Sequence, residues 1–191
     1  MHFMYHYFSR FGEISTSGME LLLSLLHQGE LTKGETLIRA NQKVDSIYCV
    51  EEGFLHYYTY SEFGDRITLN VISPDTCWTV LESFYNQEPA LGACTALTPV
   101  KYYKLERPDY LRIKAENPEL NTLIQTITEQ ILSAKVIEAN NRSKMTIEER
   151  YLHLLQNKPA MIQHVPVAVI ASLLGTSRET LHRIRRKLAA A

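Results

Sequence analysis

The sequence lacks the features that identify a metalloprotein or a membrane protein. Its 191 residues include three cysteines, at Cys49, Cys77 and Cys94, and none is paired in a C-x-x-C motif. A zinc or iron–sulfur site therefore has no support, and we expect reduced thiols in a cytoplasmic protein. No hydrophobic run approaches the length of a membrane span, and the short apolar N-terminus lacks the basic start of a signal peptide.

Catalytic motifs are also absent. The chain contains no G-x-S-x-G, P-loop, H-E-x-x-H or G-x-G-x-x-G sequence. The neighbouring carboxylates at Glu51–Glu52 and Glu148–Glu149 are explained by a turn and by a helix N-terminus, where acidic side chains are favourable. We therefore expect no enzyme, no metal site and no resident cofactor.

The charge of the chain is small overall but uneven along its length. Hydrophobic residues make up 45%, enough for a core, and the formal net charge is −1. After Gly175, however, a single acidic residue, Glu179, faces a group of basic ones: Arg178, Arg183, Arg185, Arg186 and Lys187. A local basic patch is more informative about nucleic-acid binding than the global balance.

The last two dozen residues predict two short helices joined by a tight turn. Pro166 suits the first turn of a helix, and Gly175 suits a left-handed residue at its end. Thr176 or Ser177 would cap the second helix, and Thr176 with Glu179 forms a capping box. Apolar residues at helical spacing supply the two buried faces: Val169, Ile170, Leu173 and Leu174, then Leu181, Ile184 and Leu188. With the small Ala171 where the helices would cross, this spacing predicts a helix-turn-helix.

The other face of the second helix is polar and basic. Its candidate DNA-binding residues are Ser177, Arg178, Glu179, His182, Arg183, Arg186 and Lys187. In a helix-turn-helix the second helix lies in the major groove of DNA. Arginine can pair with guanine through two hydrogen bonds, and glutamate can accept one from cytosine. The alternative interpretation is an ordinary helical hairpin with a solvated basic face.

An all-β unit is predicted upstream. Short segments rich in β-branched and aromatic residues alternate with turns that contain Gly, Pro or Asp: Leu31–Ile38, Ser46–Val50, Phe54–Tyr60, Arg66–Ile72, Ala93–Leu97 and Val100–Leu105. Such spacing is typical of a sandwich or barrel. Before these strands, a capping box at Ser17–Glu20 predicts a short helix that runs to about His27.

Helical periodicity returns near residue 108. We expect a short helix at Pro108–Ile113 and a long one over 118–139, whose apolar stripe is broken by Asn140–Ser143. The long helix carries a narrow apolar stripe: Leu120, Leu123, Ile124, Ile127, Ile131, Ala134 and Ile137. Such a stripe indicates a dimer interface or a helix packed on its own β domain, and both can hold.

A further helix is predicted between the long helix and the C-terminal pair. Thr146 and Glu149 form a capping box that opens it, and Lys158–Pro159 ends it. Residues 160–165 are then expected to be a connector.

The Leu31–Leu37 and Ile47–Gly53 segments and the turn at Gly64 resemble the β-roll of cyclic-nucleotide-binding domains. Gly175–Thr180, followed by Arg183, resembles the recognition helix of the Crp/Fnr family of bacterial transcription regulators. This resemblance covers nearly the whole chain. It implies an α+β protein with an antiparallel β-roll (double-stranded β-helix) effector domain over 1–107. A linker and dimerisation helix would follow over 108–145, and a helix-turn-helix DNA-binding domain over 146–191.

The resemblance also implies a function. The chain would be a cytoplasmic homodimer with double-stranded DNA and RNA polymerase as partners and no membrane attachment. The recognition helix would span 177–188, where Arg178, Glu179 and Arg183 would contact bases and Ser177 would contact phosphate. Few residues follow Leu188, so little would remain for a β-hairpin wing.

The effector pocket departs from the family pattern. Cyclic-nucleotide binders hold the ribose with a Gly-Glu pair and the phosphate with a later Arg followed by Ser or Thr. Here Leu81 precedes Glu82 and Ser83, which are the candidate effector-binding residues, and Gln87–Gly92 contains neither Arg nor a hydroxyl. A buried phosphate without a guanidinium partner is poorly compensated, so we do not expect cAMP to bind. Glu82 is interpreted as a structural residue bonded to backbone, with a site for an unknown effector as the alternative.

Two other functions stay open. The β-roll could sense a small molecule and signal through a protein partner rather than DNA, although an Arg-rich helix argues against this. The regulator could also bind a cyclic nucleotide despite the altered segment. The cysteine cluster of the oxygen-sensing branch is absent, and Cys77 and several histidines are the only candidates for a haem site.

Overall fold

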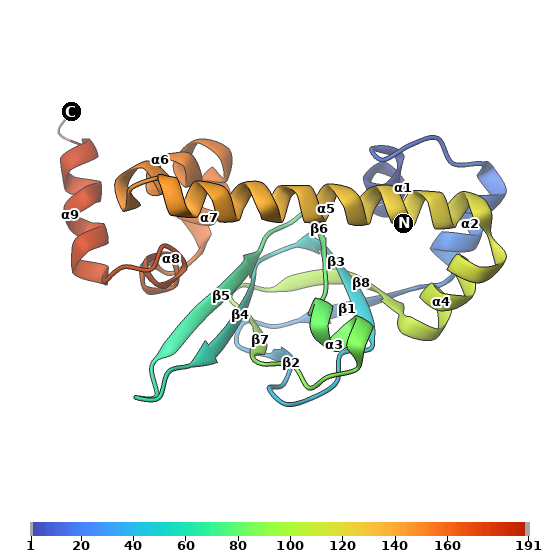
Figure 1. Ribbon diagram of the computed structural model, residues 1–191, viewed down its shortest axis with the longest axis horizontal. Coiled ribbons are helices and arrows are strands. Elements are labelled where there is room, and N and C mark those ends of the chain that lie inside the picture. The colour runs from blue at the N-terminus through green and yellow to red at the C-terminus, as the bar shows by residue number, and fades with distance from the viewer. Residues whose placement is uncertain (1, 190–191) are drawn as a thin grey trace.

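A long helix runs along one side of a β-roll, with helices gathered at both of its ends (Figure 1). The computed structural model describes residues 2–189, apart from the side chains of His2, Glu138 and residues 141–143. The helices are α1 (His2–Ser9), α2 (Thr16–Ser24), α3 (Leu81–Asn86), α4 (Arg107–Glu116), α5 (Pro118–Lys144), α6 (Ile147–Asn157), α7 (Pro159–His164), α8 (Val167–Leu173) and α9 (Arg178–Ala189). Over these residues, none of the helices is both long and apolar enough to cross a bilayer.

The described strands form two four-stranded antiparallel sheets that face each other. The strands are β1 (Leu26–Leu31), β2 (Thr36–Ile38), β3 (Ser46–Glu52), β4 (Leu55–Tyr60), β5 (Arg66–Ile72), β6 (Thr76–Trp78), β7 (Ala93–Ala96) and β8 (Val100–Glu106). Their order is β1-β8-β3-β6 in one sheet and β2-β7-β4-β5 in the other. Buried apolar side chains such as Val50, Leu55 and Ile72 pack together to form the core of this roll. The predicted antiparallel β-roll is therefore confirmed.

The predicted strands agree closely with the roll, except near its start. The segment Leu31–Ile38 was expected to be one strand, but Leu31 ends β1 and β2 begins in the other sheet. Between them Gly34 has a φ of +89°, a conformation that glycine adopts without strain and that turns the chain. Neither β6 nor α3 was predicted, because each is too short to show a periodic pattern.

The expected cap of the first predicted helix is also wrong. The N-terminus of α2 is capped by Ser15, whose hydroxyl accepts a hydrogen bond from the backbone N–H of Gly18. The helix ends at Ser24, and His27 lies in β1. A capping box places the start of a helix only to within a few residues when several serines and threonines stand together.

The long helix α5 is continuous to Lys144, so the expected end of this helix at residue 139 is wrong. Asn and Ser are weak helix formers, but they do not remove a backbone donor as proline would. In the N-terminal half, Leu120 and Leu123 are buried against the roll and its neighbouring helices, which confirms packing on the β domain of the same chain. Towards the C-terminal half, Leu132, Val136 and Ile137 are exposed by 49%, 60% and 57%.

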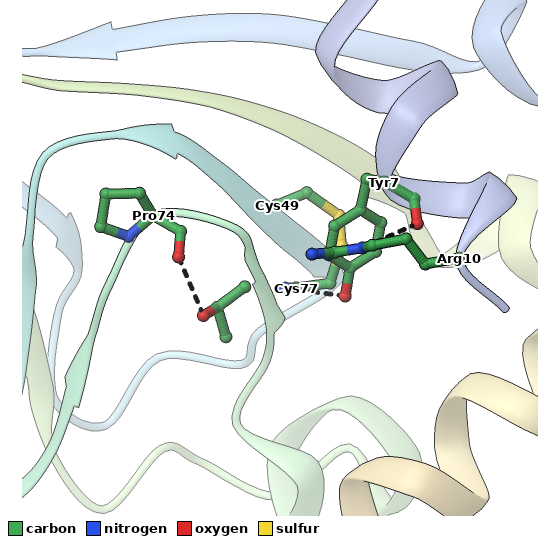
Figure 2. Close-up of a disulfide and its surroundings, with 6 residues drawn as sticks. Tyr7, Arg10, Cys49, Pro74 and Cys77 are labelled. Atoms are coloured by element: carbon green, nitrogen blue, oxygen red, sulfur yellow. Dashed lines mark hydrogen bonds between the residues drawn. A yellow bond between two sulfur atoms is a disulfide. The ribbon is translucent and has the colours of Figure 1, made fainter. Parts of the chain in front are cut away.

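Cys49 and Cys77 form a disulfide, so the expectation of reduced thiols is wrong for this pair. The two residues are direct partners in the antiparallel pairing of β3 and β6. Figure 2 shows the disulfide beside the ring of Tyr7, whose oxygen accepts a hydrogen bond from the backbone N–H of Cys77 at 3.3 Å. Helix α1 therefore covers the disulfide, while Cys94 is a free, buried thiol.

The connector expected at residues 160–165 is the helix α7. Pro159 stands in its first turn, where a missing N–H costs nothing, so the proline that ends α6 also opens α7. The capping box of α6 is present as predicted, with Thr146 and Glu149 bonded reciprocally.

Candidate nucleic-acid interface and effector cavity

Helices α6–α9 pack around a common apolar cluster. Its buried members are Tyr151, Met161, Val165, Ile170, Ala171, Leu174, Leu181 and Ile184, together with Phe54 and Val71 of the roll. Leu181 and Ile184 come from α9, so the face of α9 that carries them is fixed against the protein. The opposite face is left to solvent.

The turn between α8 and α9 positions that exposed face. Gly175 has a φ of +68° and follows Leu174, the last residue of the α8 helical conformation. The backbone N–H of Thr176 donates a hydrogen bond of 2.9 Å to the carbonyl oxygen of Ala171. Ala171 itself is 1% exposed. The small side chain of Ala171 thus lies buried at the turn, as expected.

Of the two expected caps of α9, Thr176 and Ser177, the structure uses Ser177. The hydroxyl of Ser177 accepts a hydrogen bond of 3.1 Å from the N–H of Thr180, so the expected capping box of Thr176 and Glu179 is wrong. Pro166 likewise precedes α8 as its N-cap instead of standing inside its first turn. The hydroxyl of Ser177 also donates to Thr180, so this side chain already holds the helix start.

All the candidate DNA-binding residues are exposed. They are Ser177, Arg178, Glu179, His182, Arg183, Arg186 and Lys187. A hydrogen bond from its own backbone N–H is the main cause that lowers the pKa of Glu179, which keeps this carboxylate an acceptor at neutral pH. We refer to these residues as the α9 polar face.

Lys187 of the α9 polar face has an acidic partner on a neighbouring helix. Its Nζ donates to both carboxylate oxygens of Glu148 on α6, at 2.8 and 2.9 Å. The exposed position of the pair makes the contact weak in free-energy terms. Ala189 is the last residue that the structure describes, so the expected absence of a wing lies outside the described residues.

The C-terminal helices contact the roll through the β4–β5 pair. The backbone N–H of Thr68 on β5 donates to the hydroxyl of Ser172 on α8 at 2.9 Å. The rings of Phe54 and His164 stack with centroids 5.9 Å apart. Strand β5 is therefore in direct contact with α8, and the residue before β4 is in contact with α7.

A buried histidine lies behind that contact. His56 is 3% exposed, and its Nε2 lies 2.9 Å from the hydroxyl of Thr68. Burial, with a smaller contribution from Arg66, lowers the pKa of His56 to about 4. The imidazole is therefore neutral at physiological pH.

A cavity of about 580 Å³ lies between α5 and the roll. The roll contributes Tyr57 on β4, Leu69 and Asn70 on β5, and Trp78 on β6, among others. Helix α5 contributes a row of side chains that starts at Leu120 and ends at Lys135. The disulfide lines the wall too, since both Cys49 and Cys77 contact this space.

The two candidate effector-binding residues have different surroundings. Ser83 is completely buried, and its hydroxyl accepts a hydrogen bond of 2.7 Å from the N–H of Val44, so it holds the loop before β3. Glu82 is exposed and lines the cavity. The hydrogen bond to backbone is therefore made by Ser83, whereas Glu82 lines the cavity.

The segment that the family uses for phosphate is occupied by internal hydrogen bonds. The side-chain amide of Gln87 donates to Asp45 at 3.0 Å. The backbone N–H of Gly92 donates to the hydroxyl of Tyr57 at 3.2 Å. No arginine lines the cavity in the described part of the chain.

Sequence patterns missed most of the cavity wall. Trp78 lies on β6, Tyr85 on α3 and Thr128 on α5, and each lines the space. The first two elements were not predicted at all. The isoleucines of α5 that line the cavity were predicted to belong to an apolar stripe, which would contact a second copy of the chain or the β domain. The composition of that stripe does not distinguish a buried core from the wall of a pocket.

Comparison with known proteins supports the architecture described above. Residues 28–117 match the family model of the cyclic nucleotide-binding domain. No curated protein matches the chain by sequence.

Solved structures with the same fold include bacterial regulators. The c-di-GMP-responsive global regulator CLP of Xanthomonas campestris superimposes with a TM-score of 0.69 at 17% identity, over 92% of each chain. The catabolite activator protein of Thermus thermophilus gives a TM-score of 0.58 at 19% identity, over 94% of this chain and 86% of that one. The sensor domain of the transcriptional regulator DNR of Pseudomonas aeruginosa gives 0.54 at 16%, over 74% and 88%. At these identities the likeness shows that the chain has the fold of these regulators, a cyclic-nucleotide-binding roll followed by helices.

Proposed function

We propose that the chain is a DNA-binding transcription regulator that acts as a homodimer, with α9 as the recognition helix of a helix-turn-helix. The observation that carries this proposal is the α9 polar face. All of its residues are exposed, and the opposite side of α9 is buried through Leu181 and Ile184. The fold shared with CLP and with the catabolite activator protein supports the same proposal.

We assign the contacts by chemistry. Arg178, Glu179 and Arg183 would contact base edges in the major groove, since arginine matches guanine and glutamate matches cytosine. Arg186 and Lys187 would contact phosphate, which adds affinity and salt dependence without sequence information. Lys187 would exchange its exposed pair with Glu148 for a phosphate oxygen, at little cost because the pair is weak.

The exposed apolar end of α5 is the proposed dimer contact. Leu132, Val136 and Ile137 are large apolar side chains on one stretch of helix, a composition typical of interfaces. A two-fold axis there would place two recognition helices on half-sites about 34 Å apart. RNA polymerase would be a further partner of such a regulator, which would act in the cytoplasm.

The effector is proposed not to be cAMP. In the described cavity wall no guanidinium is present to meet a phosphate, and Glu82 places a carboxylate there instead. The rival proposal is that the roll senses a ligand and signals through a protein partner. No described contact favours that rival, and we propose binding of DNA, not catalysis, as the activity.

A salt titration separates these proposals. Binding of the full chain to a random-sequence DNA duplex would be measured by gel shift at two salt concentrations. A regulator that contacts several phosphates loses affinity steeply as salt rises, by roughly tenfold or more over a fourfold increase. Binding that is absent, or unchanged by salt, would reject DNA as the partner and leave the protein-partner alternative.

A further inference from the structure

The cavity between α5 and the roll has the size of a ligand site. Its volume of about 580 Å³ falls within the range of about 300–1,000 Å³ that small-molecule pockets occupy. Packing defects in a well-folded core are rarely larger than a water molecule. The space is open to solvent on one side and much larger than such defects, so it is a pocket rather than a packing void.

The wall of the cavity is mainly apolar and aromatic. The rings of Tyr57 and Trp78 are packed together, with centroids 5.3 Å apart, on the side of the roll. Ile124, Ile127 and Ile131 face the space from α5. Such a wall favours a ligand that buries apolar surface and presents a flat ring.

Few charges face the cavity. Along the described wall the ionised side chains are Glu82 on α3 and Lys135 on α5, and Lys135 already takes part in an interaction within the chain. Asn70 and Thr128 add neutral hydrogen-bonding groups. The backbone N–H of Gly92 is held by Tyr57, so it is not free to meet an anion.

We propose that this cavity binds a neutral or weakly basic, ring-containing apolar molecule that donates a hydrogen bond to Glu82. An anionic ligand would meet a carboxylate without a guanidinium to balance it, which opposes binding. The ligand would contact β4, β5 and α5 together. Only the regulatory role of the ligand rests on the proposed function, because ligand binding itself is measured without DNA.

A second copy of the chain is the rival occupant. The α5 side chains that are most exposed, Val136 and Ile137, do not line the cavity. The α5 side chains deepest in the wall, Leu120 and Leu123, are buried within their own chain. Of the proposed dimer contact, only Leu132 also lines the cavity, so dimerisation through Val136 and Ile137 would cover one edge of the space and leave the rest available to a small molecule.

The test uses N-phenyl-1-naphthylamine, a neutral aromatic amine that becomes fluorescent in apolar surroundings. Thr128→Trp fills the cavity from α5. Thr122→Trp is the matched control, because Thr122 is exposed, does not line the cavity, and like Thr128 bonds to the carbonyl four residues earlier. Leu69→Trp fills the same space from β5 and replaces Thr128→Trp if that variant does not fold.

We expect saturable binding of the probe to the native chain and to Thr122→Trp, with affinity reduced roughly tenfold or more in the cavity-filling variants. Excess cAMP should leave the fluorescence unchanged. The proposal is overturned if the native chain does not bind the probe, if Thr122→Trp weakens binding as much as Thr128→Trp, or if cAMP displaces the probe. Binding seen only in a monomeric Ile137→Asp variant would mean that a second copy fills the cavity, and would also overturn it.

A gel shift on the same preparations separates the two proposals. Probe binding without DNA binding would contradict the proposed function and leave the ligand site intact. DNA binding without probe binding would do the reverse.

Discussion

Removal of the Cys49–Cys77 disulfide should lower the stability of the roll by a predictable amount. The bridge joins residues 28 positions apart, and closing a loop of that length removes conformational entropy from the unfolded chain. The chain-entropy relation gives about 3.5 kcal/mol for such a loop at 25 °C. For a chain of this size, that corresponds to a fall in the unfolding midpoint of roughly 7–14 °C.

The measurement is thermal unfolding followed by circular dichroism, with and without a phosphine reductant. Because the disulfide is buried under α1, the reductant must be present during a cycle of unfolding and refolding. The native chain should lose the stated amount of stability. The Cys49→Ala, Cys77→Ala double variant should show the lower midpoint in both conditions.

Cys94→Ala is the matched control, because Cys94 is buried and has no disulfide partner. Its own midpoint will differ, but the effect of the reductant on it should equal that on the native chain. A native midpoint that is insensitive to the reductant, or a double variant that responds to it as the native chain does, would refute the reasoning.

Two further predictions concern the contact between the roll and α8. Ser172→Ala leaves the N–H of the buried Thr68 without its acceptor and should cost about 1–3 kcal/mol in urea unfolding, whereas the exposed Ser24→Ala should cost much less. Folding lowers the pKa of His56 from about 6.5 to about 4, so on acidification the unfolded chain takes up a proton on this imidazole before the folded chain does. The free energy of unfolding should therefore keep its full value above about pH 6.5 and fall as the pH is lowered from there towards 4. The free energy of unfolding should fall by roughly 3 kcal/mol in total over this pH range. His56→Gln should remove this dependence on pH, and an unchanged dependence in that variant would show that another group is responsible.

Strands and helices with strong periodic patterns were predictable from the sequence. Arg66–Ile72 matches β5 at both ends, because a run rich in β-branched residues is bounded by a turn on each side. Thr146–Glu149 opened a helix as expected, since reciprocal bonding satisfies donors that would otherwise be lost. The order of roll, long helix and C-terminal helices followed from these segments.

Features that depend on register or on short elements were not predictable. Nothing in the spacing of Cys49 and Cys77 indicates that β3 and β6 place them opposite each other. The sequence left the cap of α9 open between Thr176 and Ser177, because both are good caps and only the geometry after Gly175 distinguishes them. The cavity was missed because its wall comes from several distant segments.

Sequence patterns located the α9 polar face better than the effector site. The helical period alone separates Leu181 and Ile184 from the charged side, so the exposure of Arg178 and Arg183 followed directly. Glu82 and Ser83 are neighbours in sequence, and a short helix turns one towards the cavity and the other into the core. That division is a property of α3, which had no detectable signal.

The most direct test of the central claim is the base preference of the Arg178→Ala variant. The native chain would first be used to select DNA sites from a random pool, and the affinity of each variant would then be measured for the selected site and for every single-base change in it. Arg185→Ala is the control, since Arg185 is exposed on α9 but was not assigned a base contact.

If α9 contacts bases in the major groove, Arg178→Ala should lose about 1–3 kcal/mol on the selected site and lose discrimination at one base pair of each half-site. Arg185→Ala should keep the native base preference. Selection of no common site, or an unchanged preference in Arg178→Ala, would contradict the account.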